Sequence, residues 1–190
     1  MTLPPVDGQY MLELTADLCR IPSPTGYTYR AVARAMEEAE SLGLEPVQTN
    51  KGSLLIPLGG EGKGGRLLSA HVDTLGLMVK EIKSNGRLKL TMIGGYDWST
   101  VEGEYCTVHT ARDGDITGTI VATLASFHTH APALKELKRD ADGLEVRIDA
   151  HVANADEIRA LGISVGDFVS LDARTTVVGN GYIKSRHLDD

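Results

Sequence analysis

The chain has 190 residues, of which 42% are hydrophobic, and it carries a formal net charge of −7. This length fits one ordinary domain or two small ones and is enough for a sizeable core. The acidic balance argues against nucleic acid as a partner, no apolar run approaches the length of a membrane span, and the first residues do not form a signal peptide, so the cytoplasm is the expected location.

Two amphipathic helices are predicted at the start of the chain. Apolar residues recur at helical spacing over residues 10–20 and again over residues 28–42. Residues 21–26 contain two prolines and a glycine, which separates the two helices. Gly43 suits the C-terminal cap of the second helix.

Three strands are predicted next, at residues 45–49, 53–57 and 67–72. The third is a continuous apolar run, and we expect it to be a buried strand that ends at His71 and Asp73. Because side chains two residues apart on a strand point to the same face, this strand would present the imidazole and the carboxylate together.

The pair His71 and Asp73 has the chemistry of a metal site. An imidazole is a good ligand for zinc or cobalt, and the neighbouring carboxylate either binds the metal or accepts the other N–H of the imidazole and fixes its tautomer. For this pair alone the simpler interpretation is a strand end with two ordinary polar residues, so the rest of the chain has to decide.

The sequence becomes rich in strand signals after residue 75. Residues 76–82 and 88–93 flank Asn85 and Gly86, which predicts a hairpin with a type I′ turn. Five further strands are predicted, at residues 105–109, 116–124, 144–150, 168–172 and 176–178. This density of short strands is typical of a small barrel or sandwich.

One helix is predicted within this β-rich region. Asn154 is placed to cap its first turn, and Glu157 completes a capping box. His128 and His130 lie in residues 126–132, which are predicted to form a loop. Two histidines at this spacing can bind a metal, but exposed loop histidines are the simpler interpretation.

These elements predict an α/β fold that is interrupted by a β-rich insert. We expect residues 1–75 to be the first part of an α/β domain, residues 76–178 to be a β-rich insert, and residues 179–190 to return to the α/β domain. An α/β layer needs helices on both of its faces, and the first segment supplies about half of one. We therefore expect the chain to be the front part of a longer protein.

Several short motifs occur in a characteristic order along essentially the whole chain. They lie at residues 21–26, 70–79, 93–98, 114–120, 162–167 and 184–190. Each motif is weak, but their order and spacing resemble the M42 family of metallo-aminopeptidases, the glutamyl aminopeptidase and endoglucanase-like group that builds TET particles.

The resemblance implies a partial zinc-peptidase-like α/β catalytic domain with an inserted β-rich domain, PDZ-like or barrel-like, that is used in dimerisation. It implies a homo-oligomer that removes N-terminal residues from peptides with a free amino terminus, using two divalent metal ions, zinc or cobalt. By the same resemblance His71 binds one metal, Asp73 supports that ligand and is catalytic, and Asp189 bridges both metals. A third interpretation of His128 and His130 stays open: one of them, with His130 as the first choice, would reach the site of a partner subunit, as insert histidines do in related dimeric metallopeptidases.

The general base and the later metal ligands of the family would lie beyond Asp190. Zinc sites need three or four ligands, so we expect this chain alone to be inactive and at best a weak metal binder. Two alternatives stay open: an M20-like metallo-amidohydrolase or dipeptidase, whose insert has two long helices, and a non-catalytic oligomerisation module. A glycosidase is disfavoured because the chain has one Trp and two Phe to form sugar platforms.

Overall fold

The computed structural model describes residues 5–60, 64–112, 114–179 and 181–189. It divides the chain into two compact units. One combines Met1–Asp73 with Ala173–Asp190, and we call it the discontinuous unit; the other is Thr74–Asp172, and we call it the barrel unit. Residues 173–178, which were predicted to end the insert, therefore belong to the discontinuous unit. No helix in the described part of the chain is long and apolar enough to span a membrane.

Both predicted helices of the discontinuous unit are confirmed, as α1 (Gly8–Arg20) and α2 (Tyr29–Ser41). The carboxylate of Asp7 caps α1 by accepting hydrogen bonds from the backbone amides of Gln9 and Tyr10. The chain leaves α2 through Gly43, which has a φ of +75°, a left-handed conformation that favours glycine.

Small side chains line the buried faces of these helices. Ala16 of α1 and Ala31, Val32 and Ala39 of α2 are buried. Leu42, which was predicted to lie on the same apolar face, is 59% exposed, because it lies past the last turn of α2 and has left the helical spacing.

The strands of the discontinuous unit are short. β1 (Val47–Gln48) pairs with β2 (Leu54–Leu55), and β9 (Thr176–Val178) pairs with β10 (Tyr182–Lys184), each pair antiparallel. Both sheets thus have two strands within the described residues.

The predicted buried strand at residues 67–72 is wrong. Residues 66–73 are extended but carry no strand assignment, and Leu67 and Leu68 are 83% and 88% exposed. A strand needs a neighbour to pair its backbone groups, and neither two-stranded sheet of this unit includes the segment. The apolar run therefore lacks the partner that would bury it.

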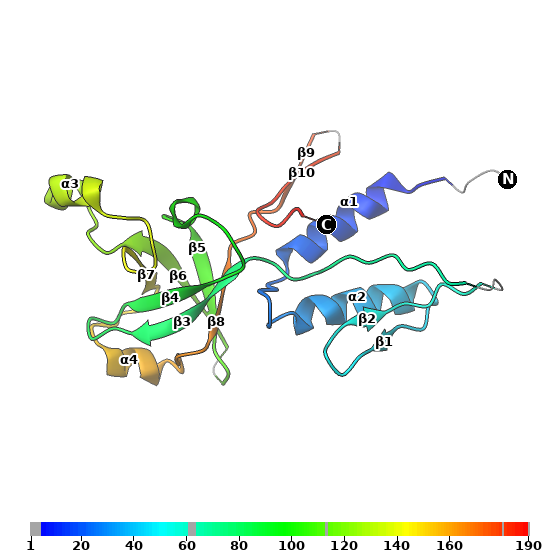
Figure 1. Ribbon diagram of the computed structural model, residues 1–190, viewed down its shortest axis with the longest axis horizontal. Helices are drawn as coiled ribbons and strands as arrows, with labels where there is room; N and C mark the ends of the chain where they lie inside the picture. The colour runs from blue at the N-terminus through cyan, green and yellow to red at the C-terminus, as the bar shows by residue number, and fades with distance from the viewer. Residues whose placement is uncertain (1–4, 61–63, 113, 180, 190) are drawn as a thin grey trace. The chain divides into compact units, whose positions relative to one another are not determined.

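The barrel unit is a closed six-stranded barrel, which confirms the barrel alternative of the prediction (Figure 1). Its strands follow the order β3-β4-β7-β6-β5-β8. They are β3 (Gly76–Ile82), β4 (Leu88–Ile93), β5 (Tyr105–His109), β6 (Asp115–Ala122), β7 (Leu144–Ile148) and β8 (Phe168–Leu171). Closure leaves the sheet without free edges, which protects it from pairing with other chains.

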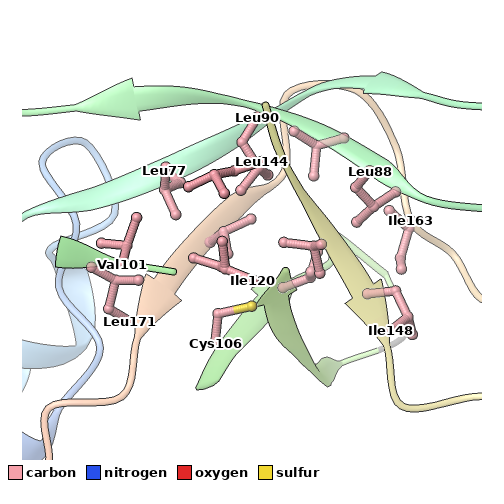
Figure 2. Packing of buried hydrophobic residues seen from close by; sticks show 14 of the residues in the cluster. Leu77, Leu88, Leu90, Val101, Cys106, Ile120, Leu144, Ile148, Ile163 and Leu171 are labelled. Carbon is pink, nitrogen blue, oxygen red and sulfur yellow. The ribbon is translucent and has the colours of Figure 1, made fainter. Parts of the chain in front are cut away.

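Alternate residues of the barrel strands point inward and form its core (Figure 2). Leu77, Leu88 and Leu90 are fully buried there. Cys106 also points into the core, and burial raises the pKa of its thiol to about 12, so this cysteine stays protonated and unreactive. Trp98 is partly buried and packs against the same cluster.

The turn between β3 and β4 differs from the predicted type I′ turn. Gly86 has a φ of +74°, and its amide donates to the carbonyl of Lys83 over 3.0 Å. Asn85 is not among the described non-glycine residues with positive φ, of which Arg174 is the sole member. The turn is therefore a type I turn followed by a left-handed glycine, the arrangement of a three-residue hairpin loop.

The barrel unit carries two α-helices where one was predicted. The additional helix, α3 (Phe127–Glu136), replaces the predicted loop around His128 and His130. The prediction failed there because Pro132 breaks the helical pattern, and the backbone indeed kinks at His130, with φ −126° and ψ 25°.

The predicted helix is confirmed as α4 (Ala155–Ala160). The Asn154 side chain accepts hydrogen bonds from the amides of Asp156 and Glu157, both over 3.0 Å. Glu157 in turn accepts from the amide of Ala153 over 2.6 Å. The arrangement differs from the predicted capping box in one bond, because Glu157 accepts from the amide of Ala153 and not from the amide of the N-cap residue Asn154.

Replacing Asn154 with alanine is expected to destabilise the barrel unit by about 1 kcal/mol, because two amides of the first turn of α4 lose their acceptor. Urea unfolding followed by Trp98 fluorescence measures this change. Asn154→Ser keeps a capping oxygen and should restore most of the loss, whereas equal losses for both variants would contradict a capping role.

Candidate metal-binding site

His71 and Asp73 lie together in the extended segment that precedes β3. The Nδ1 atom of His71 is 3.1 Å from Oδ1 of Asp73 and 3.1 Å from its carbonyl oxygen. The two side chains are 39% and 36% exposed, so the pair is open to a ligand from solvent. If a metal bound the Nε2 atom of this imidazole, Asp73 would hold the proton on Nδ1 and thereby fix the tautomer.

A third residue, Thr25, completes this arrangement. Its hydroxyl donates to Oδ2 of Asp73 over 2.5 Å, so the two carboxylate oxygens of Asp73 have different partners, the histidine and the threonine. This double contact limits rotation of the carboxylate. The sequence analysis did not identify Thr25 as a site residue, although it lies within the motif at residues 21–26.

The turn between α1 and α2 positions this hydroxyl. The amide of Tyr27 donates to the carbonyl of Pro24 over 2.7 Å, and Gly26 has a φ of +96°. A side chain would be strained at that conformation, so the glycine after Thr25 permits the tight turn that faces it toward Asp73.

Asp189 lies in the last described segment and is exposed. Two contacts hold the backbone just before it. The amide of Arg186 donates to the carbonyl of Ala173 over 2.9 Å, and the thiol of Cys19 donates to the carbonyl of His187 over 3.3 Å. These contacts fasten the end of the described chain to α1 and to the return from the barrel unit.

The described residues contain no group of three or more His, Cys, Asp or Glu side chains that could hold a metal ion. A zinc site uses three or four protein ligands. The donor set at His71 and Asp73, one imidazole with a carboxylate on its second nitrogen, fits a metal ligand and its support. These residues therefore fit part of a metal site and not a complete set of metal ligands.

A second hydrogen-bonded histidine, His109, occurs in the barrel unit, and the sequence analysis did not identify it. His109 contacts Oδ1 of Asp115 through Nδ1 and the hydroxyl of Ser170 through Nε2, both over 2.8 Å. This is the order of groups in a serine hydrolase triad. However, His109 and Ser170 are 3% and 5% exposed, so a substrate has no access, and the network instead ties β5, β6 and β8 together.

The sequence of this chain is similar to that of known aminopeptidases. A sequence profile of the M42 glutamyl aminopeptidases matches residues 52–190. The chain belongs to this family. It is 44% identical over 180 residues to the putative aminopeptidase YhfE of Bacillus subtilis (strain 168), covering 94% of this chain and 52% of that protein. It is 25% identical to the putative aminopeptidase FrvX of Escherichia coli (strain K12), covering 94% of this chain and 49% of that protein.

Solved structures of TET peptidases share the fold of this M42 chain. The TET aminopeptidase from the marine sediment archaeon Thaumarchaeota archaeon SCGC AB-539-E09 superposes with a TM-score of 0.79 at 24% identity, over 91% of this chain and 47% of that one. The Pyrococcus horikoshii TET1 peptidase, which can assemble into a tetrahedron or a large octahedral shell, gives a TM-score of 0.76 at 25% identity, over 95% and 52%. The chain thus spans about half the length of the relatives that it matches.

Proposed function

We propose that this M42 chain supplies the first part of a dinuclear-metal aminopeptidase that removes N-terminal residues from peptides. The observation that carries the proposal is the hydrogen-bonded set of Thr25, Asp73 and His71 in a chain of this family. His71 would bind one of two divalent ions, zinc or cobalt, Asp73 would support it, and Asp189 would bridge the two ions. The match to the M42 family supports this proposal over the M20-like alternative.

The residues of this chain have separable tasks in such a reaction. When bound, two metal ions supply a nucleophile at neutral pH and polarise the scissile carbonyl. Asp73 keeps the proton on Nδ1 of His71 and so leaves the electron pair on Nε2 for coordination. Thr25 restrains the carboxylate of Asp73, which preserves the direction of that hydrogen bond.

The barrel unit is the proposed dimerisation domain, and the complete protein is proposed to form a homo-oligomer through it. Support comes from the structural likeness to TET peptidases, one of which can assemble into a tetrahedron or a large octahedral shell. His130 remains the proposed contributor to the site of a partner subunit; it lies at the kink of α3, where its backbone is already outside helical geometry.

An activity assay tests the peptidase proposal. A polypeptide that covers the full length of the M42 relatives should release N-terminal residues from aminoacyl reporter substrates when zinc or cobalt is added, and a chelator should abolish the release. The 190-residue chain alone should show no turnover, because its described residues hold no three-ligand group. Robust, metal-dependent turnover by this chain alone would contradict the proposed division of the site.

A further inference from the structure

Two adjoining hollows lie on the surface of the barrel unit where β7 ends. Their volumes are about 420 Å³ and 340 Å³, which is within the range of small-molecule sites. Four residues line both hollows: Arg147, Ile148, Ala150 and His151. We call the two hollows together the β7-end cleft.

The smaller hollow contains a cation and an anion that do not neutralise each other. Arg147 and Asp149 both line it, and within the described residues neither side chain makes a hydrogen bond or an ion pair. Because both side chains line this one hollow, a single ligand bound there can reach both charges. By contrast, Glu145, two residues before Arg147 on β7, is paired with Lys83 over 2.6 Å.

The other charged residues of the cleft are already engaged. Glu157 lines the larger hollow, but its two carboxylate oxygens accept hydrogen bonds from the Ala153 amide and from the Asn154 side chain. Arg87 lies 3.8 Å from Glu145. The charges left for a ligand are therefore those of Arg147 and Asp149.

The larger hollow offers an apolar wall beside these two charges. Ala150, Val152 and Ala153 line it. A ligand held at Arg147 and Asp149 can thus extend an aliphatic group into the larger hollow and remove apolar surface from water.

We propose that the β7-end cleft binds a free α-amino acid. Its carboxylate pairs with Arg147, its ammonium group pairs with Asp149, and its side chain lies along Ala150 and Val152. A simple anion would leave Asp149 unmatched and a simple amine would leave Arg147 unmatched, whereas a zwitterion satisfies both. The proposal rests on the chemistry of the barrel unit and is independent of the proposed peptidase activity.

Calorimetric titration of the 190-residue chain tests the ligand class. L-Leucine is the probe, and its two comparators are 4-methylpentanoate, which lacks the amino group, and 3-methylbutylamine, which lacks the carboxylate. Leucine should bind saturably, and each comparator should bind about tenfold more weakly, since each loses one charged hydrogen-bonding partner. Equal binding of either comparator, or no saturable binding of leucine, overturns the proposal.

Four variants test the residues. Arg147→Gln and Asp149→Asn should each weaken leucine binding by about tenfold. Arg159→Gln and Asp156→Asn make the same changes of charge on α4, outside the residues that line the cleft, and should bind leucine as the wild type does. Circular dichroism verifies that all four are folded. Wild-type affinity in folded Arg147→Gln and Asp149→Asn overturns the proposal.

Discussion

Replacing Asp73 with asparagine is expected to lower kcat/KM of the proposed full-length aminopeptidase by about 10-fold to 100-fold, the usual effect of removing the carboxylate behind a metal-binding histidine. The variant keeps the size of the side chain and removes its charge. If the new amide nitrogen faces His71, it donates a hydrogen bond, and Nδ1 of His71 must then act as the acceptor. The histidine proton then moves to Nε2, the atom proposed to bind the metal.

The same substitution at an exposed position provides the control. The side chain of Asp156 is 95% exposed and pairs with Arg159 on α4, so Asp156→Asn should leave kcat/KM unchanged. Metal content after dialysis should fall in Asp73→Asn and not in the control. If Asp73→Asn retains both wild-type activity and wild-type metal content, Asp73 has no part in the proposed site.

The largest expected effect on stability comes from Leu77→Ala, which should destabilise the barrel unit by about 2–5 kcal/mol. Leu77 is fully buried, and its strand pairs with β4 on one side and β8 on the other. The surrounding strands are closed into a barrel, so they cannot collapse freely into the space that the leucine leaves (Figure 2).

Trp98 makes this measurement specific. It is the one tryptophan of the sequence and packs against the barrel core, so its fluorescence in a urea titration reports the barrel unit rather than the discontinuous unit. Val165, in the loop before β8, is 63% exposed, and Val165→Ala should change the free energy of unfolding by less than about 0.5 kcal/mol. Indistinguishable curves for the two variants would mean that the core is not packed as described.

Local signals were sufficient for most of the elements. The β3–β4 hairpin has its predicted bounds because alternation of apolar residues and a central glycine act over a few residues. The run at residues 67–72 shows the limit of such signals: an apolar stretch predicts burial, but whether a strand forms depends on a neighbour that the run itself does not specify. The opposite error occurred at α3, where a proline and two histidines gave the segment a weak helix propensity and no helix was predicted. The helix forms because packing of Leu134 against the barrel core overrides that propensity.

The candidate site was predictable to the extent that its residues are neighbours in sequence. His71 and Asp73 were found from their spacing and are in contact. Thr25 was missed because its hydrogen bond to Asp73 joins positions 48 residues apart. His109, Asp115 and Ser170 were missed similarly, since the barrel register and not the sequence pattern brings Ser170 beside β5.

The first and last strands of the barrel unit are hydrogen-bonded neighbours, with Gly76 paired to Ser170. The Cα atoms of such paired residues lie about 5 Å apart. The barrel unit begins and ends only two residues from this pair, at Thr74 and Asp172, so its two ends lie close together. The two ends of the inserted barrel unit are thus about as close together as the two ends of a short loop would be. Its insertion consequently adds little loop-closure entropy, which makes it a module that evolution or an engineer can excise, enlarge or exchange without re-threading the rest of the fold.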